Sequence, residues 1–412
     1  MADFEQILQK AVEDQEIPGC VLHAINRDGS FKYAKCFGKR SVREGGDQSP
    51  LQFNTTMWIA SCTKLMTSIS AMQLVEQGKL SLDEPVYKII PELKEFPILK
   101  GFDDDGKPIE EPHTVPITLR LLLSHSSGLT YGAMHPLIQK WLEYKGLDVN
   151  GNLSPYLLER FNVPMVFEPG SAWMYGPSID FAGLMVERAS GLTLEQYMQK
   201  NLWKPLGIKD MTFFLSTRPD LKERLADMSE RDPETGKVVK TDGMQPYEAK
   251  DRTEVKDCMG GQGVFSSAEE YIKVLHAILT TDENEKILKK STVEEFFKPQ
   301  LTKEASDALN ASLKDEQMNN AAAGTPQDIK KDWGLGGLLI LGETPDGKQP
   351  NTMFWGGYPN LIWWCDRKAG LTGLYAGQVV PPGDAKCAEL DRKFEAGIYE
   401  LYRKSGKMSS QL

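Results

Sequence analysis

The strongest constraint on the fold is the position of the strand-forming residues, which gather at the two ends of the 412-residue chain. Near the start, Cys20–Asn26 and Phe31–Phe37 flank the sequence Arg27-Asp28-Gly29-Ser30. An Asp-Gly pair between two strand-like runs predicts a β-hairpin. Near the end, short apolar runs separated by Gly, Pro and Asn predict an antiparallel meander; they are Trp333–Leu341, Met353–Trp355, Leu361–Cys365 and Gly370–Ala376.

Helical periodicity accounts for the rest of the chain. Apolar residues recur at helical spacing from Phe4 to Val12 and again within Ala385–Arg403, so we expect a helix at each end to pack on the sheet. Residues 65–279 show mostly helical patterns broken by polar loops. The sequence therefore predicts an α/β (α+β) protein. Residues 1–64 and 280–412 would form an α/β lobe with an antiparallel sheet, residues 65–279 a mainly helical inserted lobe, and the cleft between them the active site.

Composition narrows the partners and the location. The chain has 48 Lys and Arg against 58 Asp and Glu, a net charge of −10. This balance argues against nucleic acid or an anionic membrane surface as a partner. The first residues show neither a basic stretch nor an apolar run of the kind that a secretory signal needs, and no apolar run approaches the roughly 20 residues of a spanning helix. We therefore expect a cytoplasmic protein.

Several polar features leave alternatives open. Ser216–Asp257 and Thr302–Lys331 are long for structureless loops, so they carry extra helices or strands, or act as lids over the cleft. The acidic run Asp103–Asp105 is more typical of a solvated loop than of a metal site. None of the six cysteines forms a Cys-x-x-Cys pair, and reduced thiols are expected. A disulfide between Cys20 and Cys36, which flank the predicted hairpin, is the alternative.

The catalytic motifs that are missing favour a mechanism without metal or cofactor. The sequence has no Gly-x-Ser-x-Gly, no His-Glu-x-x-His and no phosphate-binding Gly-x-x-x-x-Gly-Lys-[Ser/Thr]. Its five histidines show no metal-ligand spacing.

The motif that is present is Ser61-Cys62-Thr63-Lys64, at the start of the apolar helical run Leu65–Gln77. Residues three apart share a helix face, so the Ser61 hydroxyl and the Lys64 amine can come within hydrogen-bonding reach. A buried lysine can act as a neutral base toward serine, and the backbone N–H of a serine near a helix start is free to meet a carbonyl oxygen. The alternative is that Ser61 caps the helix and Lys64 is solvated.

Two further segments add to this motif. Tyr175, in Trp173-Met174-Tyr175-Gly176-Pro177-Ser178, would lie on a loop between helices, where a phenol near Lys64 could share the proton of Ser61. In Trp355-Gly356-Gly357-Tyr358, paired glycines permit close backbone approach, and the Tyr358 N–H could complete an oxyanion hole with that of Ser61. A structural tyrosine and a plain β-bulge are the competing interpretations.

Together these residues resemble, in order and spacing, the serine β-lactamase and penicillin-binding-protein family, particularly its class C β-lactamase and family VIII carboxylesterase branch. Within it, the chain is most similar to the fungal lovastatin-type acyltransferases. Further stretches extend the resemblance over nearly the whole chain: Ile17–Gly19, Leu121–Leu129, Pro205–Ile208 and Gly260–Ser266. The resemblance implies a β-lactamase/transpeptidase-like fold. It also implies Ser61 as the acylated nucleophile, Lys64 and Tyr175 as the base pair, and the amides of Ser61 and Tyr358 as the oxyanion hole. Other residues expected to line the substrate site are Tyr131, Trp173, Trp355, Gly356 and Gly357.

Departures from the β-lactamase pattern sharpen the expected activity. Pro177 and Trp355 stand where class C enzymes carry the Asn of Tyr-x-Asn and the Lys of Lys-Thr-Gly, so the cation that would meet a β-lactam carboxylate is missing. We therefore expect a serine acyltransferase of secondary metabolism. It would move a short acyl group from an ester or thioester donor, free or held on a carrier protein, to an alcohol of a small polyketide-like acceptor. A carboxylesterase is the close alternative. A β-lactamase and a non-enzymatic binding protein are further ones.

Overall fold

A seven-stranded sheet forms the centre of the computed structural model, which describes residues 2–148, 153–241 and 243–407. Its strand order is β10-β11-β12-β13-β14-β1-β2, and every neighbouring pair is antiparallel. The strands are β1 (Gly19–Asn26), β2 (Lys32–Gly38), β10 (Lys331–Trp333), β11 (Leu338–Ile340), β12 (Thr352–Gly357), β13 (Leu361–Asp366) and β14 (Leu371–Ala376). The predicted hairpin and meander are confirmed.

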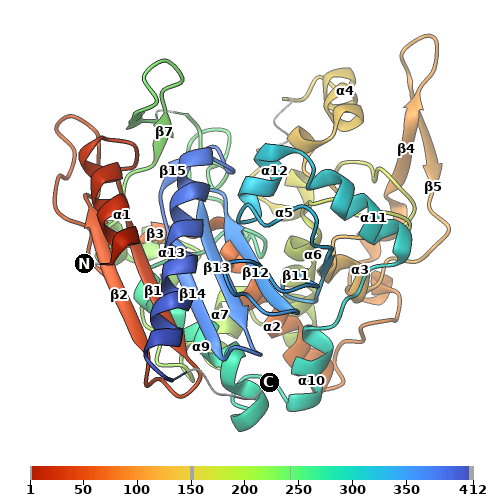
Figure 1. Cartoon of the computed structure of the whole chain (residues 1–412). Coiled ribbons are helices and arrows are strands. Elements are labelled where there is room, and N and C mark those ends of the chain that lie inside the picture. The colour runs from red at the N-terminus through yellow and green to blue at the C-terminus, as the bar shows by residue number, and fades with distance from the viewer. Residues whose placement is uncertain (1, 149–152, 242, 408–412) are drawn as a thin grey trace.

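Both ends of the chain build this part of the molecule. β1 pairs with β2 on one side and with β14 on the other, where Val21 lies opposite Ala376. Helices α1 (Asp3–Glu13) and α13 (Ala385–Lys404) lie side by side over the sheet (Figure 1), with the rings of Phe4 and Phe394 6.0 Å apart. α9 (Ala268–Asn284) also packs on β1, β13 and β14. Because helices cover both of its faces, every residue of β13 and β14 is buried.

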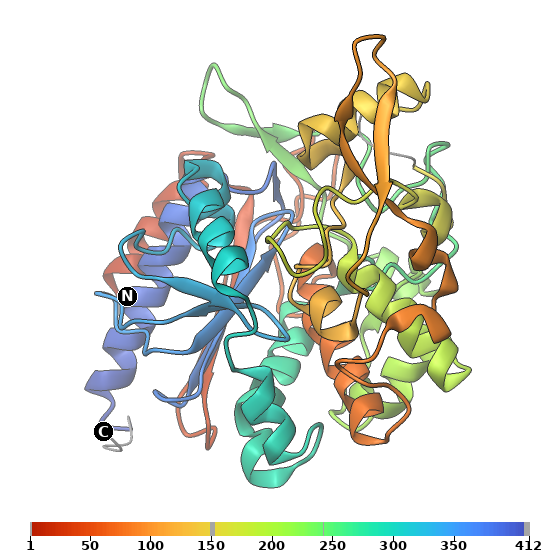
Figure 2. The same cartoon turned by 90° about the vertical axis from the view of Figure 1, so that its right-hand side faces the viewer.

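The helical part of the molecule surrounds one central helix, α2 (Thr63–Glu76). Every residue from Thr63 to Leu74 is buried, as its apolar sequence predicts. α2 packs against α6 (Ser178–Ser190) and α7 (Leu194–Met198), and α3 (Leu119–Leu123) packs on α6. Figure 2 shows these orange to yellow-green helices on one side and the sheet with α1 and α13 on the other. α9 begins before residue 280 and already packs on the sheet, and the exact lobe boundary stays a prediction.

The remaining elements are short. The helices are α4 (Pro136–Tyr144), α5 (Leu157–Arg160), α8 (Pro219–Lys222), α10 (Lys290–Phe296), α11 (Lys303–Ser312) and α12 (Glu316–Ala321). The strands are β3 (Met57–Trp58), β4 (Pro97–Phe102), β5 (Pro108–Pro112), β6 (Met211–Thr212), β7 (Ser229–Arg231), β8 (Val238–Lys240), β9 (Phe265–Ser266) and β15 (Val379–Val380). Short 3-10 helices are η1 (Ala60–Cys62), η2 (Val86–Lys88), η3 (Pro91–Glu95), η4 (Gly132–Met134) and η6 (Leu215–Thr217), and η5 (Gln199–Trp203) is a π-helix.

The polar segments contain regular structure. Ser216–Asp257 holds α8 and the β7–β8 hairpin, whose β7 pairs in parallel with β15. Thr302–Lys331 holds α11 and α12, which pack on β10 and α13. The run Asp103–Asp105 lies between the paired strands β4 and β5. Among the described residues, no group of three or more His, Cys, Asp or Glu side chains could hold a metal ion.

Two other expectations concern thiols and membranes. All six cysteines are free thiols, so the alternative of a Cys20–Cys36 disulfide is wrong. None of the helices in the described ranges has the length and apolar character that crossing a bilayer requires.

Candidate active site

Ser61 lies in a sharp turn that joins β3 to α2. β3 pairs with β9, and the Ile59 N–H donates to the Val264 carbonyl at 3.1 Å, so the chain is fixed before it turns. Ala60 then adopts a left-handed conformation with φ of 45°, which costs energy for a residue with a Cβ and is retained where the surroundings impose it. Ser61 follows in η1, half-buried, while its neighbours on both sides are fully buried. Ser61 is therefore partly accessible in a turn whose flanking residues are buried.

Lys64 lies one turn further along the chain and is only 1% exposed. Its Nζ is 3.2 Å from Ser61 Oγ, 3.2 Å from the Tyr131 hydroxyl and 2.7 Å from the Gly261 carbonyl oxygen. The structure thus brings the serine and the lysine together, and the alternative of a solvated Lys64 is wrong.

Tyr175 lies on the loop before α6, as its sequence predicts, and its hydroxyl is 2.7 Å from Ser61 Oγ. The Trp355 indole N–H donates to the same phenol oxygen at 3.1 Å. Lys64 Nζ is 4.7 Å from the centre of the Tyr175 ring, which is close enough for attraction between a cation and an aromatic face. The oxygen of Tyr175 therefore lies between the serine hydroxyl and a neutral N–H donor.

The end of β12 lies directly against the turn that holds Ser61. A Cβ on Gly357 would come within 2.5 Å of the Ile59 carbonyl oxygen, so only glycine allows this approach. The pairing of β12 with β13 runs without a shift from Met353 to Gly357, and the alternative of a β-bulge is therefore wrong. Tyr358 follows, 37% exposed, with its ring 5.9 Å from that of Trp58.

Two further expected site residues, Trp173 and Tyr131, lie behind or beside Tyr175. Trp173 is 4% exposed and its ring centre is 6.5 Å from that of Tyr175, so it backs the tyrosine from within the core. Tyr131 places its ring 5.8 Å from Tyr175, and its hydroxyl reaches both Lys64 and Asp180.

His125 contributes to the site, although sequence reasoning gave it no role. It is fully buried, its ring centre is 4.7 Å from that of Tyr175, and neither ring nitrogen has a hydrogen-bond partner in the described part of the chain. Burial lowers the pKa of His125 well below its usual value, so this imidazole stays neutral. Its carbonyl oxygen accepts a hydrogen bond from Met174 N–H at 3.0 Å, which ties the segment to the loop of Tyr175.

Sequence reasoning also assigned no site role to Asp180 or Gly261. Asp180 is in the first turn of α6, where an acidic residue is common because it favours the helix N-terminus. Its full burial and its contacts with Tyr131 and with the Gly261 N–H depend on segments far away in sequence. Nothing in the local sequence distinguishes it from an ordinary exposed residue of a helix start.

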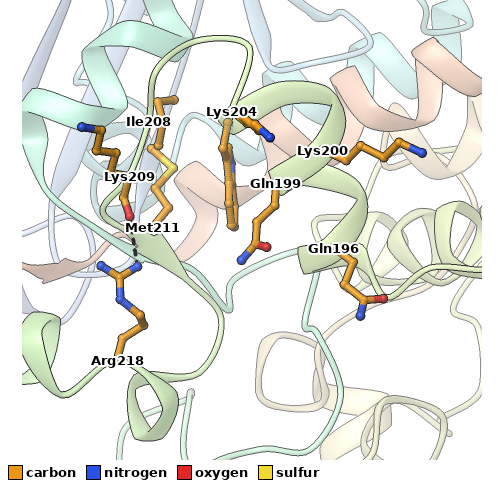
Figure 3. A pocket seen from close by; sticks show the side chains of 9 residues that line it. Gln196, Gln199, Lys200, Lys204, Ile208, Lys209, Met211 and Arg218 are labelled. Atoms are coloured by element: carbon orange, nitrogen blue, oxygen red, sulfur yellow. Dashed lines mark hydrogen bonds between the residues drawn. The ribbon is translucent and has the colours of Figure 1, made fainter.

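A separate hollow of about 420 Å³ lies on the helical side of the molecule and shares no lining residue with the Ser61 centre. Figure 3 shows its side chains, with Lys200 pointing away from the others and Arg218 directed at the Lys209 carbonyl. Arg218 is also paired with Asp210 and Asp220. Because its cations diverge or are already paired, this hollow does not form a concentrated anion site. Its lining is Gln196, Gln199, Lys200, Trp203, Lys204, Ile208, Lys209, Met211 and Arg218.

Comparison with known proteins shows the family of this chain. A model of the family described as Beta-lactamase matches residues 4–397. The chain belongs to the β-lactamase family. The predicted resemblance is therefore confirmed over nearly the whole sequence.

Relatives within the family carry two kinds of name. The monacolin J acid methylbutanoyltransferase of Aspergillus terreus is 39% identical over 405 residues, covering 97% of this chain and 96% of that protein. The lovastatin esterase of Penicillium rubens is 38% identical over 403 residues, covering 97% of this chain and 98% of that protein.

Solved structures confirm the predicted fold. Unliganded simvastatin synthase (LovD) from Aspergillus terreus superposes with a TM-score of 0.88 at 38% identity, covering 97% of this chain and 98% of the other. EstCE1, a hydrolase with promiscuous acyltransferase activity, shares the fold with a TM-score of 0.73 at 21% identity, covering 96% of this chain and 97% of the other.

Proposed function

We propose that this protein is a serine acyltransferase that forms an acyl-Ser61 intermediate. It takes a short acyl group from a thioester or ester donor and passes it to an alcohol of a small, polyketide-like acceptor. One observation carries the proposal. The hydroxyl of the half-buried Ser61 lies 2.7 Å from the Tyr175 phenol oxygen and 3.2 Å from the Lys64 amine. Both groups are close enough to accept its proton or to return it.

In the first half of the reaction, Tyr175 acts as its phenolate and takes the proton of Ser61 as Oγ attacks the acyl carbonyl carbon. Collapse of the tetrahedral intermediate breaks the bond to the thiolate or alkoxide, which leaves with the proton from Tyr175. In the second half, the acceptor hydroxyl gives its proton to Tyr175 and attacks the acyl carbon. The bond from the acyl carbon to Ser61 Oγ then breaks, and Tyr175 returns the proton to Ser61. Trp355 N–H and Lys64 stabilise the negative charge that passes through the phenol oxygen.

The developing charge on the carbonyl oxygen needs its own donors. We assign this role to the backbone N–H groups of Ser61 and Tyr358. Ser61 is at the start of a helical segment, where N–H groups lack partners within the helix. The close approach that Gly357 permits brings the end of β12 beside that turn. Gly356 and Trp355 would then border the acyl group.

The residues around Tyr175 favour esters over β-lactams. The indole of Trp355, which bonds to the Tyr175 oxygen, stands where β-lactamases present a cation, and Pro177 has no side-chain amide. A chromogenic cephalosporin should therefore turn over more slowly than a short-chain p-nitrophenyl ester. The opposite order would favour the β-lactamase alternative.

Hydrolysis is the second candidate function. The relative named lovastatin esterase covers this chain as completely as the relative named methylbutanoyltransferase does, at almost the same identity. The two activities share the acyl-Ser61 step and differ in whether water or an alcohol takes the acyl group.

The deciding experiment follows the intermediate by mass spectrometry. The protein is incubated with a short acyl thioester, and the Ser61 peptide is monitored for the added acyl mass in the wild type, in Ser61→Ala and in Ser312→Ala as a matched control. Decay of acyl-Ser61 is then timed in buffer and across a panel of alcohols. Faster decay with an alcohol, and an ester product, supports transfer. A decay rate that is the same with and without alcohol supports the esterase. The absence of acyl-Ser61 would overturn both the transferase and the esterase proposals.

A further inference from the structure

We infer that Asp180 and Tyr131 are positioning residues for this centre. They hold Lys64 in place, and they give the two tyrosines beside Lys64 different roles. In this arrangement Tyr131 keeps its proton and orients Lys64, whereas Tyr175 moves the proton of Ser61. The inference rests on the proposed acyl transfer at Ser61 and assigns roles to groups that the reaction itself does not touch.

Four hydrogen bonds form a closed ring behind Ser61. Lys64 donates to the Gly261 carbonyl at 2.7 Å, and the Gly261 N–H donates to Asp180 Oδ1 at 2.9 Å. On the other side, Lys64 Nζ is 3.2 Å from the Tyr131 hydroxyl, which donates to Asp180 Oδ2 at 3.3 Å. Both carboxylate oxygens of Asp180 accept a hydrogen bond. One is linked to Lys64 through Gly261 and the other through Tyr131.

The directions of these bonds follow from the donors available. A lysine ammonium has three N–H donors and no acceptor, and Lys64 has three acceptors within reach, the third being Ser61 Oγ. The Tyr131 hydroxyl has one hydrogen, which points to Asp180, so its lone pair faces Lys64. Removing Asp180 would let this hydroxyl rotate and leave Lys64 with a poorly oriented partner.

The surroundings of Tyr131 separate its role from that of Tyr175. Burial raises the pKa of Tyr131 well above its usual value, and the nearby Asp180 carboxylate adds to this effect. Tyr131 therefore remains a neutral hydroxyl. Among the described residues, no carboxylate bonds to the Tyr175 hydroxyl. Its oxygen meets Ser61 and the Trp355 N–H, which stabilises negative charge.

Gly261 shows how tightly Asp180 is enclosed. A Cβ at this position would lie 2.2 Å from Asp180 Oδ2 and would displace the carboxylate. Burial raises the pKa of Asp180, while Lys64, the Gly261 N–H, the Tyr131 hydroxyl and Arg160 favour its charged form. The guanidinium of Arg160 donates to three backbone carbonyls rather than to a carboxylate, so its charge acts on Asp180 from a distance. Asp180 is in the first turn of α6, where the helix dipole also favours an anion.

The test uses Tyr131→Phe and Asp180→Asn in the full chain. Tyr197→Phe and Asp391→Asn serve as matched controls, because each removes a buried hydroxyl or carboxyl outside the ring. The rate of Ser61 modification by a fluorophosphonate and the kcat and KM for a p-nitrophenyl ester are measured from pH 5 to pH 10, together with the thermal unfolding midpoint.

We expect the two ring variants to lower the rate of Ser61 modification and kcat about 10- to 100-fold with little change in KM, the size of losing one hydrogen bond to a charged group. Removing the negative charge of Asp180 makes it harder to protonate the group that accepts the proton of Ser61. Asp180→Asn should therefore move the acidic limb of the pH profile by about one unit toward lower pH. The controls should leave both rate and profile unchanged.

Wild-type rates and an unmoved acidic limb in folded Asp180→Asn and Tyr131→Phe would overturn the inference. If Asp180→Asn does not fold, Tyr131→Phe decides, because it keeps the ring that packs on Phe161 and Tyr175. The proposed function fails in a different way, since the wild type itself would then form no acyl-Ser61 from a thioester. The phosphonate reaction needs only a nucleophilic serine and reports on the ring even in that case.

Discussion

Asp180 and Asp391 are both fully buried aspartates on helices, but their surroundings are opposite. Both oxygens of Asp180 accept hydrogen bonds, and they connect α6 to Lys64 through Tyr131 and Gly261. Neither oxygen of Asp391, on α13, has a hydrogen-bond partner within the described residues. The two carboxyls are thus equally buried but differ in whether their oxygens accept hydrogen bonds.

The neighbours of Asp391 extend this contrast. Glu395 lies one turn further along α13, fully buried, and forms an ion pair with Lys348. Lys348 is also 2.8 Å from Asp346. Burial raises the pKa of Asp391 well above its usual value, and the negative charge of Glu395 adds to the effect. Because a buried charge without partners is costly, Asp391 is held neutral. The proposed role of the ring at Asp180 is to position Lys64 beside Ser61, whereas the cation beneath α13 pairs with carboxylates of its own cluster.

The largest expected effect belongs to the catalytic region. Tyr175→Phe removes the hydroxyl nearest to Ser61 Oγ and should lower the rate of acyl-Ser61 formation about 10²- to 10⁴-fold, the usual size of general base catalysis. The free energy of unfolding should change little, because the ring still packs on His125 and Trp355. Single-turnover acylation and urea unfolding separate the two effects. Rapid acylation of a folded Tyr175→Phe would show that Lys64 alone accepts the proton.

The largest effect on stability belongs to the region beneath α13. Lys348→Met removes the cation that faces Glu395, and leaving a buried carboxylate unpaired typically costs about 3–5 kcal/mol. We expect a loss of this size in urea unfolding at pH 8, with kcat per folded molecule unchanged. A variant as stable as the wild type would mean that Glu395 is neutral without Lys348.

The contrast also explains how much could be predicted from the sequence. The terminal helices, the hairpin and the meander follow from local periodicity, and α2 follows from a run that is apolar on nearly every side. Ser61 and Lys64 share a helix face because of their spacing alone. These features depend on neighbours in the chain, which a single sequence displays.

The partners of Lys64 that are distant in sequence could not be found in this way. Tyr131 is 67 residues away in sequence from Lys64 and 49 from Asp180, and Gly261 is 81 residues from Asp180. Whether a polar residue is buried and partnered depends on such distant segments. The left-handed turn at Ala60 is likewise held by the pairing of β3 with β9, and alanine gives no local sign of it.

A moderate effect on stability is expected from Asp391→Asn, with a sign that depends on pH. The folded chain keeps the proton of Asp391 where the unfolded chain has lost it, so wild-type stability falls as the pH rises from about 4 toward the raised folded pKa. Asparagine has no such proton. The variant should be about 1–3 kcal/mol more stable than the wild type at pH 8 and nearly equal at pH 4. Parallel stability curves from urea unfolding would contradict the neutral state of Asp391.

The smallest expected effect tests the indole N–H that donates to Tyr175. Trp355→Phe removes the N–H that bonds to the Tyr175 oxygen at 3.1 Å and keeps most of the aromatic surface against Trp333. Losing one neutral hydrogen bond should lower the acylation rate about 2- to 10-fold. The loss should be largest with the poorest leaving groups, because those reactions place the most negative charge on the phenol before the leaving group departs. A series of aryl esters of rising leaving-group pKa measures this slope in the wild type and in Trp355→Phe. Equal slopes would mean that the indole orients Tyr175 without stabilising its charge.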